Sequence, residues 1–387
     1  MRISKPYLRE EENCTKLCAM IQWGDRKEEA WFAVEKEFSS YLTEERTDAF
    51  VVGFLTEAMK QGENIQCEGA VTKRLLYQLN HYLIPTLSKH THRYQNIIIS
   101  APVVTDALSC AGAVGTGWTG GVDSMYTAMK HLEVEPDRHK LTHLLIANNG
   151  ALESDKNQEV LEYMAKKARE GMAKDYNLTV VAIDSNLQIL LEEPYLAVAA
   201  FRLPAVVLAL QKLFGVFLNS AGYEFQRFSF VEENSAYYEL LPLSCFETDC
   251  TVFYSACGAV TRLQKLNELA AFPPARKYLH PCIYTMQENC GTCGKCVRTI
   301  SALYALEKLD AFSQVFDVKQ FYEKKSWYLA NILAKEESQH YGEVAALLRR
   351  KNMEIPADAV RQARIMRIAS KAAGKHKEDL LRAEKRR

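Results

Sequence analysis

The fold of this chain is decided by one stretch of its sequence, Gly115-Thr116-Gly117-Trp118-Thr119-Gly120-Gly121-Val122-Asp123-Ser124. The stretch follows an apolar run and precedes a helical pattern that opens at about Ser124. Gly120 and Gly121 let backbone N–H groups approach an anion without interference from a Cβ atom. The N-terminus of the following helix adds N–H groups and the positive end of its dipole. The stretch therefore predicts a phosphate-binding loop between a strand and a helix, although an ordinary glycine-rich turn with an N-cap is the simpler alternative.

A second pattern lies far downstream, where four cysteines have the spacing C-x7-C-x2-C-x2-C: Cys282, Cys290, Cys293 and Cys296. Four thiolates on one short loop can converge tetrahedrally on Zn²⁺, and Gly291 and Gly294 supply the tight turns that this requires. Such a site contributes folding free energy and no chemistry, because all four coordination positions are filled. The alternatives on the same residues are an iron–sulfur cluster and free or disulfide-bonded thiols. The spacing favours zinc.

Together these two patterns resemble a known family. The loop Thr119-Gly120-Gly121-Val122-Asp123-Ser124 resembles the Ser-Gly-Gly-x-Asp-Ser signature of the PP-loop ATP pyrophosphatase superfamily, with Thr119 in place of the first Ser. With the cysteines and the Arg298 that follows them, it resembles the cyano-deazaguanine synthase branch of the queuosine pathway. The resemblance covers residues 115–309. It departs at Asn148-Asn149-Gly150, where that branch has an acidic residue before x-Gly.

The resemblance implies a synthase that cleaves ATP to AMP and pyrophosphate. The cleavage adenylates a carboxylate or amide, which a nitrogen nucleophile then attacks. The expected catalytic residues are Asp123, Ser124, Arg262 and Lys265, with Mg²⁺ on the phosphates and the two cations opposite the α-phosphate. Exposed helix charges are the alternative reading of those two cations. The expected ATP-binding residues are Trp118, Thr119, Gly120, Gly121, Val122, Asp123, Ser124, Asn149 and Ser220.

Two other functions stay open. A sulfur-inserting enzyme acting on RNA, a peptide or a small molecule uses the same loop and adds a reactive cysteine. Cys110, Cys245, Cys250 or Cys257 could serve as that residue, although the seven cysteines outside the cluster read first as small core residues. A non-enzymatic nucleotide-binding component of an assembly is the second alternative.

Composition sets the frame for the partners. Lys+Arg and Asp+Glu are equal at 48 each, so no global charge recruits nucleic acid. The first twelve residues lack the apolar core of a signal peptide, and charged or polar residues interrupt the most apolar segment, residues 195–218. Eleven cysteines in such a chain indicate a reducing cytoplasm. We expect ATP and a carboxylate- or amide-bearing substrate as partners, and no membrane. A protein-borne or carrier-borne substrate and a homo-oligomer stay open.

The order of apolar patterns predicts an α/β fold with a doubly wound parallel sheet of the PP-loop type. We expect a small N-terminal α/β module (1–93), the PP-loop domain with its zinc-binding loop (94–312, loop 282–296) and a helical C-terminal extension (313–387). The expected elements are a hairpin in 12–45, helices at 48–60, 71–87 and 157–176, and strands at 94–103, 141–148, 178–185 and 215–220. Strand ends then bring Gly120, Asn149, Ser185 and Ser220 to one rim.

The basic stretch 361–387 reads as a solvated helix face, with phosphate steering as the alternative.

Overall fold

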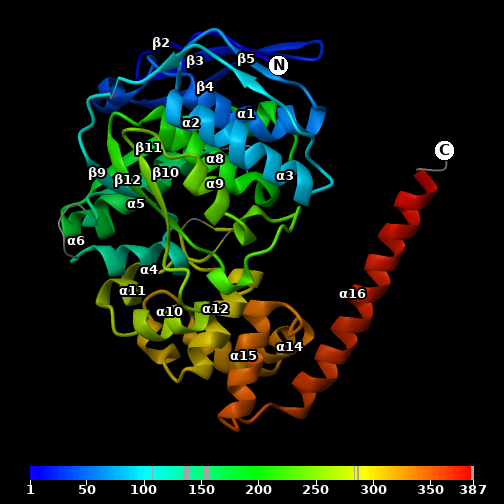
Figure 1. The fold of residues 1–387 in the computed structure, drawn as a ribbon. Helices are drawn as coiled ribbons and strands as arrows, with labels where there is room; N and C mark the ends of the chain where they lie inside the picture. Colours follow the sequence, from blue (N-terminus) through cyan, green and yellow to red (C-terminus); the bar gives the residue numbers. More distant parts are fainter. Residues whose placement is uncertain (107, 134–138, 151–156, 283, 286, 385–387) are drawn as a thin grey trace. The chain divides into compact units, whose positions relative to one another are not determined.

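The computed structural model describes residues 1–384, apart from 107, 134–138, 151–156, 283 and 286. The chain forms two compact units (Figure 1). Unit 1 comprises Met1–Thr119 and Tyr126–Val260, and unit 2 comprises Gly120–Met125 and Thr261–Arg387. The double glycine and the start of the following helix therefore belong to the same unit as the cysteines and the C-terminal helices.

Unit 1 is built on one large sheet, whose strands run in the order β13-β12-β9-β10-β11-β4-β3-β1-β5-β7. Its first five strands pair in parallel: β13 (Val252–Ala256), β12 (Phe214–Ser220), β9 (Ala113–Gly117), β10 (His143–Ala147) and β11 (Thr179–Ser185). This arrangement confirms the α/β class and the strands expected at 141–148, 178–185 and 215–220. The carboxyl ends of these strands meet along one edge.

The N-terminal residues extend the same sheet. The expected hairpin is confirmed as β3 (Cys14–Trp23) and β4 (Arg26–Glu35), and β4 pairs antiparallel with β11. The remaining strands are β1 (Arg2–Ile3), β2 (Tyr7–Glu10), β5 (Ile65–Cys67) and β7 (Ile99–Ser100), with β6 (Val71–Thr72) and β8 (Val103–Val104) forming a separate pair.

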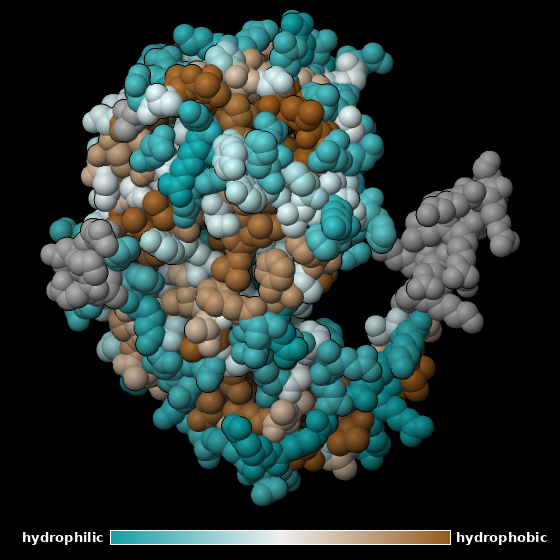
Figure 2. Space-filling model, viewed as in Figure 1, coloured by the Kyte–Doolittle hydropathy of each residue, from teal (hydrophilic) through white to brown (hydrophobic). Residues whose placement is uncertain are grey.

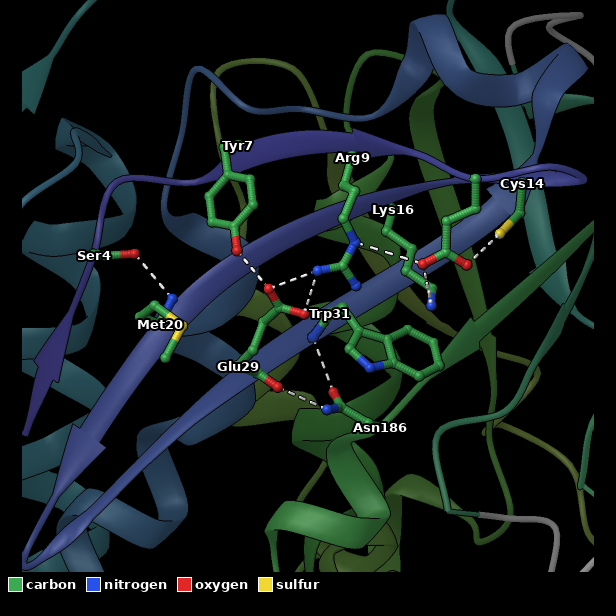
Figure 3. Close-up of polar contacts among 10 residues, drawn as sticks. Ser4, Tyr7, Arg9, Cys14, Lys16, Met20, Glu29, Trp31 and Asn186 are labelled. Atoms are coloured by element: carbon green, nitrogen blue, oxygen red, sulfur yellow. Dashed lines mark hydrogen bonds and ion pairs between the residues drawn. The ribbon is translucent and has the colours of Figure 1, made fainter.

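One side chain ties β4 to the end of β11. Asn186 donates from Nδ2 to the carbonyl of Glu29 at 2.8 Å, and its Oδ1 accepts from the N–H of Trp31 at 2.9 Å (Figure 3). On the outer side of the hairpin, Tyr7 and Arg9 both reach the Glu29 carboxylate, with 2.7 Å from Arg9 Nη1 to Glu29 Oε1 (Figure 3). The hairpin is therefore held to the parallel strands by backbone pairing and by an amide that satisfies two backbone groups at once.

The helices of unit 1 flank this sheet. They are α1 (Asp48–Gln61), α2 (Lys73–Gln78), α3 (Ile84–His90), α5 (Asn157–Ala168), α6 (Lys174–Tyr176), α7 (Leu187–Leu190), α8 (Tyr195–Ala209) and α9 (Leu240–Cys245). The helices expected at 48–60 and 157–176 are confirmed, and the helix expected from residue 71 begins at Lys73. Helices α1 and α8 lie side by side (Figure 1). At this contact Gly53 of α1 faces Ala205 of α8 and Leu187.

The prediction of a strand at 94–103 is wrong. Only the two-residue strands β7 and β8 form there, and Ile98 and Val103 are 59% and 51% exposed. The strand that leads into the double glycine is β9, made of small residues. Gly115 is required within it, because a Cβ at that position would come within 2.4 Å of the Phe214 ring.

Unit 2 is helical. It contains the start of α4 (Val122–His131) and then α10 (Arg262–Leu269), α11 (Pro273–Tyr278), α12 (Gly294–Ala305), α13 (Val318–Glu323), α14 (Lys325–Ala334), α15 (Gln339–Arg350) and α16 (Ala357–Glu384). These elements confirm the helical C-terminal extension expected beyond the cysteines. On the face seen in Figure 2, hydrophobic residues form several patches among hydrophilic ones. Among the described residues, no helix has the length and apolar character needed to cross a membrane.

Candidate functional site

The glycine loop connects β9 to α4 over four residues, Trp118 to Gly121. Gly120 has φ +69°, a conformation that favours glycine. Its carbonyl accepts from the N–H of His280 at 2.7 Å, and the Gly121 carbonyl accepts from Ser124 Oγ at 3.2 Å. The N–H of Trp118 donates to the Leu145 carbonyl at 2.8 Å and so continues the β-ladder. Trp118 is thereby removed from the expected set of backbone phosphate donors.

Within unit 2, Asp123 is paired with both expected cations. Lys265 Nζ lies 3.0 Å from Asp123 Oδ1, and Arg262 Nη2 pairs with Asp123 Oδ2. Thr261 begins α10 with a capping box, which places Arg262 and Lys265 one turn apart on the same side of the helix. The Lys265 side chain is 2% exposed and that of Arg262 15%, so the alternative reading as exposed helix charges is wrong.

The pairing decides the charge state of Asp123. Burial alone would raise the pKa of its carboxyl, but the positive charges of Arg262 and Lys265 outweigh burial and hold the pKa below its ordinary value. Asp123 is therefore ionised at neutral pH and shared by two cations. In this arrangement the Asp123 carboxylate orients Arg262 and Lys265. This role fits the pairing better than direct ligation of Mg²⁺ by Asp123.

Two more cations and a histidine belong to the same charged group. Desolvation, followed by repulsion from Arg262 and Arg298, lowers the pKa of Lys295. Lys295 and Arg298 lie in the first turns of α12. His340 lies on α15, is 9% exposed, and interacts electrostatically with Arg262 and Arg298. Sequence patterns identified Arg298 but missed Lys295 and His340. The position of Lys295 inside the cysteine motif could have identified it, whereas no local pattern marks His340.

The strand-end residues lie in unit 1. Asn149 follows β10, is 2% exposed and hydrogen-bonds Tyr195. Ser220 ends β12, where its Oγ lies 3.4 Å from Thr116 Oγ1. Ser185 ends β11 and donates from Oγ to the Asn148 carbonyl at 2.7 Å. Parallel pairing places these residues along one edge, as expected. The expected site residues thus fall into both units, with Trp118, Thr119, Asn149 and Ser220 in unit 1 and the others in unit 2.

A buried carboxylate at the same edge of unit 1 was not foreseen. Glu239, 7% exposed, accepts from Asn219 Nδ2 at 3.0 Å and from Ser255 Oγ at 2.6 Å. Asn219 and Ser255 stand at the carboxyl ends of β12 and β13. The sequence carries no motif around Glu239, and its position depends on long-range strand pairing.

The four cysteines of unit 2 converge as expected. One sulfur from each of Cys282, Cys290, Cys293 and Cys296 lies within 4.8 Å of the others. Cys293 is the N-cap of α12, and its Sγ accepts from the N–H of Cys296 at 3.4 Å, while Cys290 Sγ accepts from the N–H of Cys293 at 3.2 Å. Among the described residues no disulfide joins any pair of cysteines.

The chemistry of this cluster fits zinc. Burial alone would raise the pKa of the Cys282 thiol. Hydrogen bonds from the Thr285 hydroxyl and from backbone N–H groups outweigh burial and lower this pKa to about 6. A thiolate is the form that binds metal. Four thiols that approach one another this closely, with N–H groups directed at their sulfur atoms, match a closed tetrahedral Zn²⁺ site.

The cysteines considered for sulfur transfer differ in their surroundings. Burial raises the pKa of Cys245 to about 11 and also raises that of Cys250. Both are therefore poor thiolates. Cys257 follows β13 at the strand-end edge and adopts φ +63°, which is unusual for a residue other than glycine. Comparisons with protein-family models, with curated proteins and with solved structures yield no match for the chain.

Proposed function

We propose that this protein is an ATP-dependent synthase of the PP-loop type, which adenylates a carboxylate or amide and releases pyrophosphate. The observation that carries the proposal is the pairing of Asp123, in the first turn of the helix that follows the double glycine, with Arg262 and Lys265 of α10. The double glycine, the N-terminus of α4, the buried Lys265 and the half-buried Arg262 lie in one compact unit, and a polyphosphate binds to elements of this kind.

In the proposed reaction, the loop from Thr119 to Ser124 receives the β- and γ-phosphates through backbone N–H groups and two hydroxyls. A substrate oxygen attacks the α-phosphorus, and the bond to the β-phosphate oxygen breaks, so that pyrophosphate leaves with its electron pair. Arg262 and Lys265 stabilise the negative charge that develops on the phosphates. Asp123 holds both cations in place before ATP arrives. Mg²⁺, when bound, adds charge neutralisation on the phosphates.

The cysteines support this site indirectly. We assign Zn²⁺ to Cys282, Cys290, Cys293 and Cys296, where it fixes the N-terminus of α12. Lys295 lies between two of these ligands and Arg298 follows the last. The metal thereby positions two cations of the charged group and takes no part in the chemistry.

Product analysis tests the proposal. We expect the protein to convert ATP to AMP and pyrophosphate when screened with deazapurine acids, peptides and RNA together with ammonia. Ser124→Ala should lower the rate about tenfold or more, because Ser124 contributes a hydroxyl to the phosphate loop. Ser244→Ala is the matched control, since Ser244 Oγ likewise donates to the carbonyl three residues earlier, that of Leu241, at 2.8 Å. Release of ADP and phosphate with the productive substrate would contradict the proposal.

The sulfur-inserting alternative is favoured by one observation, the placement of Cys257 at the strand-end edge with a left-handed backbone. That function requires a persulfide on the cysteine. Treatment with a sulfane-sulfur donor such as a small-molecule persulfide, whose outer sulfur passes to the cysteine thiolate while the donor leaves as its thiol, followed by mass analysis distinguishes the two functions. If a substrate-dependent persulfide forms on Cys257 and Cys257→Ala forms no product, the nucleophile is sulfur and not nitrogen.

A further inference from the structure

His340 belongs to the C-terminal helices, yet it lies beside the cations assigned to phosphate binding. It is in the first turn of α15, which packs against α10 and α12. With Arg262, Arg298 and Thr299 it lines a small cavity of about 10 Å³. A space of this size holds about one water molecule. His340 is therefore enclosed among residues of the charged group.

The surroundings of His340 determine its charge. Burial, followed by the positive charges of Arg262 and Arg298, lowers the pKa of the imidazole to about 3, against the opposing effect of Asp123. The imidazole is thus neutral at physiological pH. A neutral imidazole offers one hydrogen-bond donor and one acceptor.

A neutral side chain suits this position for an electrostatic reason. Arg262, Lys265, Lys295 and Arg298 supply four positive charges, against the carboxylates of Asp123, which pairs with two of them, and of Glu343, which lines the same cavity. Arg262 Nε is buried and makes no hydrogen bond within the described part of the chain. An imidazole that shares a one-water cavity with the two arginines can accept a hydrogen bond directly or through a single water, without adding charge.

We propose that His340 is a positioning residue of the phosphate site, where its uncharged imidazole holds the Arg262 and Arg298 guanidinium groups in the orientation that receives the leaving pyrophosphate. The C-terminal helices, through α15, then complete the site. This inference rests on the proposed function and deepens it.

Pyrophosphate binding by isothermal titration tests the role, together with KM and kcat for ATP. We expect His340→Phe, which keeps an aromatic ring but removes the hydrogen bonds, to bind pyrophosphate about tenfold more weakly. His340→Gln, which restores a neutral donor and acceptor, should recover affinity to within about threefold. His143→Phe is the control, because burial lowers the pKa of His143 as well, but this residue lies on β10 in unit 1. Its pyrophosphate affinity should equal that of the unmodified protein.

The outcomes separate the two claims. If the unmodified protein and His340→Phe bind pyrophosphate equally, the role of His340 is wrong and the proposed function stands. If His340→Gln is as weak as His340→Phe, the hydrogen-bonding role is overturned. If the unmodified protein binds neither pyrophosphate nor ATP, the proposed function fails and this role fails with it. Should His340→Phe not fold, His340→Leu replaces it in the same comparison.

Discussion

Replacement of Cys296 by serine is expected to release the bound metal and to unfold the helices of unit 2. Cys296 is fully buried in the first turn of α12, and its sulfur is one of four that lie within 4.8 Å of one another. Binding of structural Zn²⁺ contributes about 10 kcal/mol or more in small zinc domains. The unmodified protein should hold one Zn²⁺ per chain by elemental analysis, and the variant none, with a large loss of helical circular dichroism.

Cys67→Ser supplies the control for this experiment. Cys67 is 5% exposed in β5 of unit 1, far in sequence from the cluster. Its substitution should cost about 1–2 kcal/mol and leave the zinc content unchanged. Iron with acid-labile sulfide in the purified protein would identify a cluster instead and favour the sulfur-inserting function. A metal-free protein that keeps its full helical content would contradict the assignment.

The second large effect is expected from Asp123→Asn. This change removes the carboxylate that Arg262 and Lys265 share, and Lys265 is 2% exposed. Breaking a buried pair of this kind costs about 3 kcal/mol. Turnover should fall about 100-fold or more, because the cations lose the group that orients them. The loop residue therefore supports stability as well as catalysis.

The dependence on pH provides an independent check of this pair. The pKa of Asp123 lies below its ordinary value in the folded protein, so the pair contributes stability above pH 4 and loses it as the pH falls through the folded pKa. We expect the free energy of unfolding, measured in urea from pH 7 to pH 3, to fall less steeply in Asp123→Asn than in the unmodified protein, because the variant lacks the carboxylate that must be protonated. Asp358→Asn is the control, since the ion pair of Asp358 with Arg361 is exposed and should contribute less than about 0.5 kcal/mol. Identical acid transitions in the unmodified protein and in Asp123→Asn would refute the pairing.

Local patterns made much of the fold predictable. The hairpin of β3 and β4, the helix α1 and the strands β10 to β12 all carry apolar periodicities long enough to identify. The cysteine spacing likewise predicted a cluster that the structure confirms. The strand before the glycine loop was misplaced, because β9 consists of Ala, Val, Gly and Thr and lacks a long apolar run. Gly115 within it is dictated by Phe214 on a neighbouring strand, which fills the space that a Cβ would occupy.

The arrangement of the site depended on tertiary contacts that the sequence does not encode locally. Nothing around His340 indicates that α15 packs beside α10 and α12. The pairing of β4 with β11 and the placement of Glu239 between two strand ends arise in the same way. Asp123 and Lys265 were named as catalytic candidates from a motif and a helix, but their pairing with each other required the structure, since the two residues are far apart in sequence.

The central claim is that the loop and the paired cations bind the phosphates of ATP, and equilibrium binding of α,β-methylene-ATP tests it most directly. This analogue cannot be cleaved between the α- and β-phosphates, so the measurement does not depend on the unidentified substrate. We predict one binding site per chain by isothermal titration in the presence of Mg²⁺. Lys265→Met should bind about tenfold or more weakly, because it removes a buried cation from the site. Absence of binding by the unmodified protein, or equal affinity in Lys265→Met, would contradict the account.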